Sequence, residues 1–214
     1  MSQPKANLEA NLSSESLHLI ERFCWWFHII GILAFIVYLS YSKHLHILLA
    51  FPNTYYSKLQ PAGQLSNMSN VTNEVKLMMD PDADPYAVAA EPADEPEKFG
   101  ASDVFDLNRI QLLNAYTCTE CGRCTSECPA NQTGKKLSPR KIMMDTRDRL
   151  EEVGRGIDAA KKAGTPVEGR FEDGKDLHSY VSAEELWACT TCNACAEACP
   201  VNINTVDIIV HMRQ

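Results

Sequence analysis

Eight of the nine cysteines in the chain fall in two runs with the same spacing. The first run is Cys118-Thr-Glu-Cys121-Gly-Arg-Cys124-Thr-Ser-Glu-Cys128-Pro129, and the second is Cys189-Thr-Thr-Cys192-Asn-Ala-Cys195-Ala-Glu-Ala-Cys199-Pro200. Both read C-x2-C-x2-C-x3-C-P, a spacing at which thiolates hold iron–sulfur clusters. The proline after each fourth cysteine turns the chain away and donates no backbone hydrogen bond. Two complete motifs predict an electron-transfer function.

The spacing also predicts which cysteines act together. Three thiolates on one tight loop can bind three irons of a cubane, while the fourth cysteine opens the next helix and points elsewhere. In proteins with two such motifs the fourth cysteine therefore ligates the other cluster. We assign two [4Fe–4S] clusters: cluster 1 takes Cys118, Cys121, Cys124 and Cys199, and cluster 2 takes Cys189, Cys192, Cys195 and Cys128.

Structural zinc and disulfides are the competing interpretations of clustered cysteines. Zinc sites close on themselves with two C-x2-4-C pairs, and they do not require a repeated three-plus-one pattern. Nine cysteines are an odd number, and the motif thiols lie too close in sequence for a disulfide framework. Reduced thiols require a reducing compartment, so we expect the cysteine-rich domain to face the cytoplasm.

A second chemical feature is an apolar run from Phe23 to Tyr41, 19 residues without a formal charge. As a helix it would be about 28 Å long, close to the hydrocarbon thickness of a bilayer. Tryptophans near one end and tyrosines near the other match the interfacial aromatic residues of membrane helices. We expect a single membrane span. A cleaved signal peptide, which would need an A-x-A site that is missing here, and a buried soluble helix are the alternatives.

The helix is predicted to continue beyond the membrane face until Pro52 ends it. On that continuous helix His28 and His46 are 18 residues apart, which is five whole turns. Both imidazoles would lie on one face about 27 Å apart, an arrangement that suits axial ligation of two b-type haems. The alternative is that His28 hydrogen-bonds a neighbouring helix while His46 is solvated among lipid headgroups.

The predicted fold class is mainly α: one transmembrane helix followed by an α-helical ferredoxin domain with two cluster-binding loops. The expected parts are a flexible N-terminal tail (1–16), the membrane helix with its extension (17–51), an acidic proline-rich linker (52–98) and the ferredoxin-type domain (99–214). Of the net charge of −8, residues 52–97 contribute −6 through two basic and eight acidic residues. No part is basic enough to predict a nucleic-acid partner.

Helix signals occur between and after the two motifs. Ser138-Pro139 provides an N-cap and a proline at the first helical position, and Gly154 is predicted to end that helix. Ser182-Ala-Glu-Glu185 is a capping box just before the second motif. Residues 205–213 are predicted to form a short final helix.

The chain resembles the membrane-bound iron–sulfur oxidoreductases related to heterodisulfide reductase, in the runs FDLNRIQLLNAYTCTECGRCTSECPANQTGKKLSPRKIMMDTRDRLEEVG and LWACTTCNACAEACPVNI. The resemblance implies an α-helical ferredoxin domain with two [4Fe–4S] clusters. The span and its continuation YSKHLHILLAFPNTYYSKL are similar to the last helix of the haem-b subunit of respiratory nitrate reductase. In that helix two histidines about five turns apart serve two haems, which carries over onto His28 and His46 only.

The chain departs from this family in two ways. Family members usually have several more membrane helices upstream, which supply the second axial histidine of each haem. Related enzymes also carry CCG modules downstream, and this chain has no adjacent cysteine pair. We therefore expect a truncated member, whose haem would need additional membrane helices or another subunit.

The predicted function is electron transfer through two [4Fe–4S] clusters and haem b, between a soluble redox partner and the quinone pool. The family implies a flavoprotein or disulfide-reductase-like partner and menaquinone, at the inner (cytoplasmic) membrane. No catalytic residue is predicted, because the redox chemistry belongs to the cofactors. The alternatives are the iron–sulfur subunit of a flavin-dependent dehydrogenase and a haem-free membrane-tethered ferredoxin.

Overall fold

The computed structural model describes residues 13–61, 63–80, 99–165 and 169–214. These residues are mainly helical and include no strand. The chain forms two units, one from Met1 to Leu45 and the other from His46 to Gln214.

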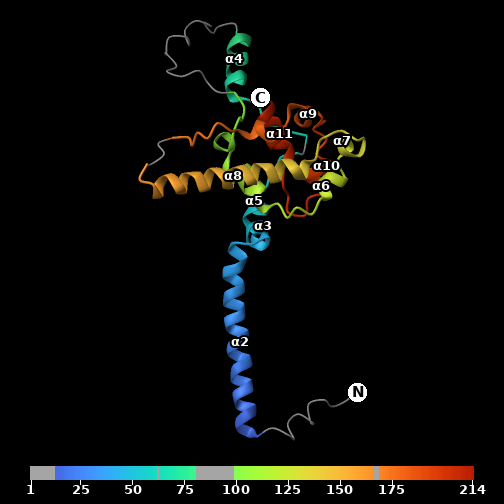
Figure 1. The fold of residues 1–214 in the computed structure, drawn as a ribbon. Coiled ribbons are helices and arrows are strands. Elements are labelled where there is room, and N and C mark those ends of the chain that lie inside the picture. Colours follow the sequence, from blue (N-terminus) through green and yellow to red (C-terminus); the bar gives the residue numbers. More distant parts are fainter. Residues whose placement is uncertain (1–12, 62, 81–98, 166–168) are drawn as a thin grey trace. The chain divides into compact units, whose positions relative to one another are not determined.

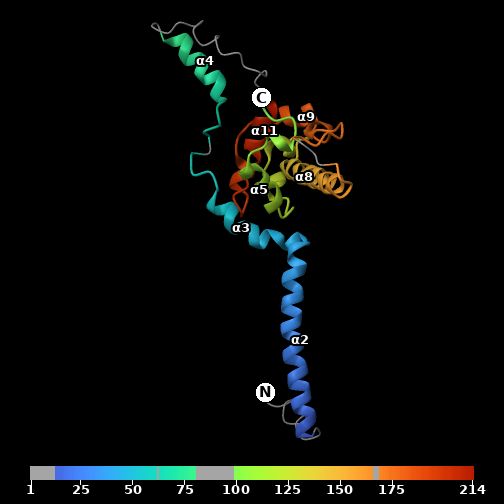
Figure 2. The ribbon, with the colours of Figure 1, turned by 90° about the vertical axis from the view of Figure 1, so that its left-hand side faces the viewer.

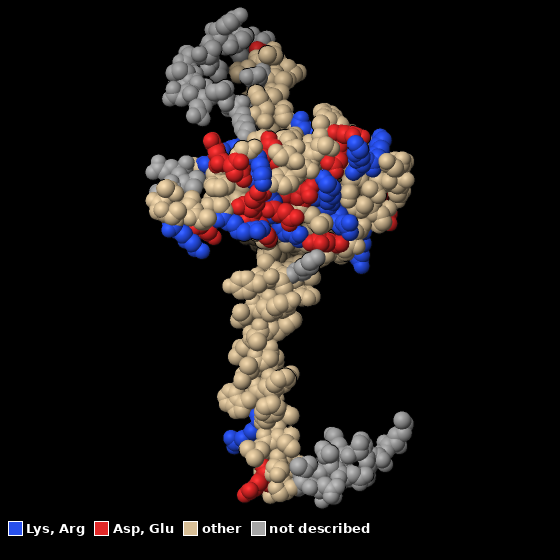
Figure 3. Space-filling view, viewed as in Figure 1, with Lys and Arg blue, Asp and Glu red and all other residues tan. Residues whose placement is uncertain are grey.

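The first unit is dominated by one helix, α2 (Ser14–Ser40). Its N-cap is Ser13, whose side-chain oxygen accepts a hydrogen bond from the Ser16 N–H at 3.3 Å. The helix is long and apolar enough to cross a membrane. Figure 3 shows charged side chains on α2 only near its N-terminal end, with uncharged residues along the rest of the visible surface. The start at Ser14 falls inside the predicted flexible tail, and residues 1–12 lie outside the described ranges.

The helix does not continue to residue 51 as predicted. After Ser40 comes a turn, then a short 3-10 helix, η1 (Lys43–Leu45), and then α3 (His46–Tyr55). At the turn, the side chain of Ser42 donates to the Leu39 carbonyl at 3.4 Å and accepts from the His44 N–H at 3.2 Å. A serine that bonds nearby backbone groups in this way competes with helical hydrogen bonding. Pro52 was predicted to end the helix, and it instead lies inside α3.

The second unit is a packed set of helices and short helical turns. Its elements are α3, α4 (Ser69–Met79), η3 (Val104–Asp106), α5 (Arg109–Thr117), α6 (Arg123–Ser126), α7 (Pro129–Gln132), α8 (Pro139–Lys162), η4 (Leu177–Ser179), α9 (Ala183–Trp187), α10 (Ala194–Glu197) and α11 (Thr205–Arg213). The long helix α8 packs against α5, α6 and α11, while α5 also contacts α3 (Figures 1 and 2). Helix α4 lies within the predicted linker, where the sequence gave no expectation of a helix; residues 81–98 of that linker lie outside the described ranges.

Capping signals position the helices as the sequence predicts, with one exception. Ser138 caps α8, Ser182 and Glu185 form the capping box of α9, and α11 has the predicted bounds. Gly154, however, does not end α8, which continues to Lys162. A glycine costs a helix interior only about 1 kcal/mol, and tertiary packing outweighs that cost here.

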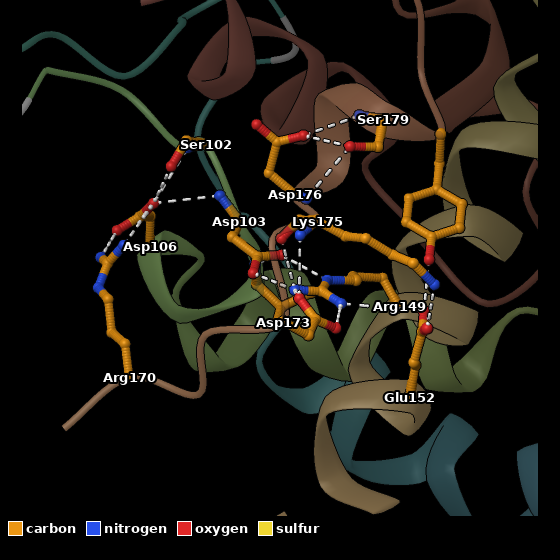
Figure 4. Close-up of polar contacts among 12 residues, drawn as sticks. Ser102, Asp103, Asp106, Arg149, Glu152, Arg170, Asp173, Lys175, Asp176 and Ser179 are labelled. Atoms are coloured by element: carbon orange, nitrogen blue, oxygen red, sulfur yellow. Dashed lines mark hydrogen bonds and ion pairs between the residues drawn. The ribbon is translucent and has the colours of Figure 1, made fainter. Parts of the chain in front are cut away.

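A buried arginine joins α8 to two loops of this unit. The Arg149 side chain is fully buried, and its guanidinium donates to both carboxylate oxygens of Asp103, at 3.0 and 2.8 Å. It also donates to Asp173 at 2.9 Å and to the Lys175 carbonyl at 2.7 Å (Figure 4). Hydrogen bonding to Arg149 lowers the pKa of Asp173 to about 2. Because a buried charge is tolerated only when it is paired, this network fixes both loops to α8.

Candidate iron–sulfur centres

The two cysteine loops follow the same backbone path. Glu120 and Thr191, at matching positions, have φ of +58° and +56°, and Gly122 and Asn193 have φ of +83° and +60°. Left-handed residues two apart bend each loop tightly, and glycine and asparagine are well suited to that conformation. Gly122 is the N-cap of α6 and Asn193 is the N-cap of α10, so each loop passes directly into a short helix.

The first set of predicted ligands surrounds one cavity. Cys118, Cys121 and Cys124 from the first motif line it together with Cys199 from the second motif. Apolar side chains of Met143, Val201 and Ile203, among others, complete the wall, and Cys195 also reaches it. All nine cysteines have free thiols. Thiolates on a partly apolar cavity are the donors that an iron–sulfur cluster requires, so the residues present fit such a group.

The second set of predicted ligands is also close together. Burial, together with the nearby thiols of Cys189, Cys124 and Cys128, raises the pKa of Cys195 to about 12. Burial raises the pKa of Cys189 as well, and Cys128 and Cys192 add to this shift. Cys128 and Cys195 are buried, whereas Cys121 and Cys192, the second cysteine of each motif, are exposed. The structure thus groups the fourth cysteine of each motif with the first three of the other.

These groups do not form an ordinary mononuclear metal site. Among the described residues no three His, Cys, Asp or Glu side chains are arranged to hold a single ion. A four-iron cube asks for a wider spacing, because each thiolate binds a different iron.

Backbone N–H groups in both loops point at cysteine sulfurs. The Thr191 N–H donates to the Cys189 sulfur at 3.4 Å. In the first loop the Glu120 N–H acts in the same way on Cys118, and the Arg123 N–H lowers the pKa of Cys121. Hydrogen bonds to sulfur stabilise negative charge there and are one of the determinants of cluster potential.

An arginine lies near the first cysteine of each motif, which the spacing did not predict. Arg147 on α8 pairs with Glu120 at 2.8 Å, and although burial raises the pKa of Cys118, the charge of Arg147 opposes that shift. Arg213 on α11 donates to the carbonyls of Cys189, at 2.6 Å, and Leu186, at 3.0 Å. The acidic residue inside the first motif was the one sequence signal that could have pointed to such a pair.

The two predicted haem ligands lie in different helices. His28 is exposed within α2, and His46 is the first residue of α3. The interruption at residues 41–45 removes the continuous five-turn register on which their common face depended. Haem ligation by this pair stays a prediction.

Comparison with known proteins agrees with the cysteine geometry. The family model of the 4Fe-4S dicluster domain matches residues 117–203. The chain is 31% identical to the probable iron-sulfur-binding oxidoreductase FadF of Bacillus subtilis, over 89% of this chain and 27% of that protein. It is 28% identical to the EtfAB:quinone oxidoreductase of Syntrophomonas wolfei, over 98% of this chain and 28% of the relative. It is 40% identical to a probable membrane-anchored ferredoxin of Chromohalobacter salexigens, over 60% of this chain and 20% of that protein.

The chain spans little more than a quarter of the length of the first two relatives. Subunits C and D of CoB–CoM heterodisulfide reductases from methanogenic archaea also match the cysteine-rich part. No solved structure matches the chain. The protein therefore carries a 4Fe–4S dicluster domain and is an iron–sulfur electron-transfer protein related to the oxidoreductases of the FadF and heterodisulfide reductase type.

Proposed function

We propose that the protein is a membrane-anchored relay that passes electrons between a soluble redox partner and the quinone pool through two [4Fe–4S] clusters. In this proposal cluster 1 is held by Cys118, Cys121, Cys124 and Cys199, and cluster 2 by Cys189, Cys192, Cys195 and Cys128. The clusters would supply one-electron transfer. The protein's own residues hold them, exclude water from them and direct backbone N–H groups at the ligand sulfurs.

The observation that carries the proposal is the position of Cys199. It lies 71 positions after Cys128, its counterpart in the first motif, and it lines a cavity with the other three cysteines of cluster 1. A single motif closing on itself would have brought Cys128 to that cavity instead. Crossed ligation is what a two-cluster protein needs.

Membrane attachment is supported by α2 and by one relative. The helix has the length and composition to cross a bilayer, and a relative 40% identical over its matched part is described as a membrane-anchored ferredoxin. The reduced cysteines favour a cytoplasmic position for the cluster domain, at the inner membrane. A relative described as a quinone oxidoreductase supports the quinone pool, for which we propose menaquinone, as one redox partner. For the other partner we propose a flavoprotein or a disulfide-reductase-like subunit.

The test is a spectroscopic and chemical analysis of the anaerobically purified full chain in detergent. About eight iron and eight sulfide per chain, charge-transfer absorbance and a paramagnetic signal after dithionite are expected. Cys24→Ser, outside both motifs, should keep all of these signals. In vesicles containing menaquinone, the dithionite-reduced protein should reduce the quinone. Absence of iron–sulfur signals would refute the relay, and intact clusters without quinone reduction would refute the quinone half of the proposal.

A second candidate is a haem-free membrane-tethered ferredoxin. It is favoured by the interruption between α2 and α3, which removes the helical register of the two histidines. A pyridine haemochrome assay on protein purified with its native membrane partners separates the two candidates. If haem is bound, His28→Ala and His46→Ala should each remove part of its absorbance while the iron–sulfur signals stay. Retention of the full haem absorbance in both variants would exclude these residues as ligands.

A further inference from the structure

A buried asparagine on α3 contacts the chain just after a predicted cluster ligand. The side chain of Asn53 is 1% exposed, and its Nδ2 donates to the Val201 carbonyl at 2.7 Å. Its Oδ1 is buried and has no hydrogen-bond partner among the described residues. A buried polar group that satisfies only its donor side is unusual, and it indicates that the donor contact has a purpose of its own.

The matching carbonyl in the first motif is bonded differently. Val201 is the second residue after Cys199, and Ala130 is the second residue after Cys128. Ala130 lies in α7, and its carbonyl accepts from the Lys135 N–H at 3.0 Å and from the Thr133 hydroxyl at 3.0 Å. The first motif therefore fixes this carbonyl with residues that directly follow it.

The second motif has no such local support. No helix forms after Cys199; the chain makes a turn in which the Asn202 N–H donates to the Cys199 carbonyl at 3.2 Å, with Asn202 in the left-handed region at φ +56°. The Val201 carbonyl of this turn is held by Asn53, which is 148 residues away in sequence. A distant side chain thus replaces the helix that supports the first motif.

The turn forms part of the wall of the cluster 1 cavity. Cys199, Pro200, Val201 and Ile203 all line it, beside the first three cysteines of the first motif. A loose turn would move the Cys199 sulfur and admit water to the cavity. Solvent access and ligand geometry both set the potential of an iron–sulfur centre.

We propose that Asn53 is a positioning residue for cluster 1: by holding the Val201 carbonyl it fixes the Cys199 turn and keeps water from that cluster. This inference rests on the proposed ligation. Cluster 2 does not depend on Asn53, because the turn after its ligand Cys128 is supported by α7.

The test compares the redox potentials of the two clusters in Asn53→Leu, a change that keeps side-chain size and removes the donor. Redox titrations of the full chain are followed by electron paramagnetic resonance. Cys121→Ser and Cys192→Ser, which each disable one cluster, identify the two signals. In Asn53→Leu the cluster 1 potential should move to a more positive value, because water stabilises the more negative reduced state, while the cluster 2 potential stays unchanged.

Two matched controls sharpen the result. Thr54→Ala changes an exposed neighbour on the same helix and should leave both potentials in place. Thr133→Val removes the side-chain bond to the Ala130 carbonyl but leaves the Lys135 N–H, so the cluster 2 potential should move little. Hydrogen exchange of the full chain gives a second measurement, in which Asn53→Leu should accelerate exchange in residues 199–204 relative to residues 128–135.

The outcomes separate the inference from the proposed function. A shift confined to cluster 1, with faster exchange in its turn, supports Asn53 as a positioning residue. Unchanged potentials, a shift in cluster 2, or equal loss of iron from both clusters would overturn the role of Asn53 while leaving the relay intact. Wild-type protein without clusters would instead overturn the proposed function, and this inference with it.

Discussion

The two cysteine loops have the same backbone path but different surroundings. Both place left-handed residues at the third and fifth positions, and both direct an N–H at the sulfur of the first cysteine. Around the first loop a basic residue, Arg147, is paired with the carboxylate of Glu120. Around the second loop Arg213 donates to backbone carbonyls and stacks on Trp187, 5.1 Å from the ring centroid.

Burial differs between the two sets of proposed ligands as well. The cluster 2 set contains both buried motif cysteines, Cys128 at 6% and Cys195 at 7% exposure, whereas no cysteine of the cluster 1 set is buried. Lower solvent access disfavours the more negative reduced state. Two motifs of identical spacing can therefore hold clusters of unequal potential, which is what a directional relay requires.

The largest expected effect comes from breaking the crossed ligation that joins the loops. Cys199→Ser should resemble Cys121→Ser, and Cys128→Ser should resemble Cys192→Ser, because each pair removes a ligand from the same cluster. Each variant should lose about half of its iron, measured chemically, and one of two paramagnetic signals. If Cys199→Ser instead resembled Cys192→Ser, each motif would close on its own cluster.

The next largest effect concerns support that both loops share. Arg149→Met leaves Asp103 and Asp173 without their buried partner, and it should destabilise the cluster domain by about 3–5 kcal/mol. Denaturant unfolding of the loaded protein measures this change. The control is Arg155→Met, whose pairing with Glu151 is exposed and should contribute about 0.5 kcal/mol or less. An equally small effect of Arg149→Met would show that the network is dispensable.

Two glycines two residues apart on α8 give a matched test of the helix behind the first loop. A Cβ at Gly156 would lie 2.3 Å from the Phe171 ring, whereas nothing lies within 4 Å of a Cβ at Gly154. Gly156→Ala should therefore destabilise the protein by about 1–3 kcal/mol through overpacking. Gly154→Ala should stabilise it by about 0.5–1 kcal/mol through helix propensity. Thermal unfolding of both variants checks the opposite signs, and the same sign in both would contradict this account.

The smallest expected effect tests the electrostatic difference between the loops. Arg147→Met removes a positive charge close to Cys118, so the cluster 1 potential should fall by on the order of 50 mV. The cluster 2 potential should stay within the error of the titration. Glu120→Gln removes the opposing charge and should shift the cluster 1 potential in the other direction. Equal shifts of both clusters would show that the charge acts on the whole domain and not on one loop.

Local signals in the sequence were sufficient for the loops and most of the helix starts. Cysteine spacing, the capping residues Ser138 and Ser182, and the final apolar run act over a few residues, so they are readable without the fold. The predictions differed from the structure where two local preferences compete. Gly154 and Pro52 are helix breakers by preference, yet both lie inside helices, because packing against α5 and neighbouring segments outweighs a local cost.

The break between α2 and α3 was not predictable from periodicity. The residues from Ser42 onward are compatible with a helix, and the competing hydrogen bonds of the Ser42 side chain decide the outcome. Contacts between distant residues were equally hidden. Asn53 and Val201, or Arg149 and Asp103, carry no mutual signal, since hydrogen-bond partners chosen by tertiary packing have no fixed spacing.

The sequence by itself determined the chemistry: two four-thiol motifs, reduced cysteines and one helix apolar enough for a bilayer. These features depend on residue type and short spacing, which the chain carries whatever its fold. Only the tertiary structure decided how the thiols are grouped, which arginine lies near which loop, and how far each cysteine is from water. Those properties arise when segments separated by up to 148 residues pack together, and local sequence cannot specify that packing.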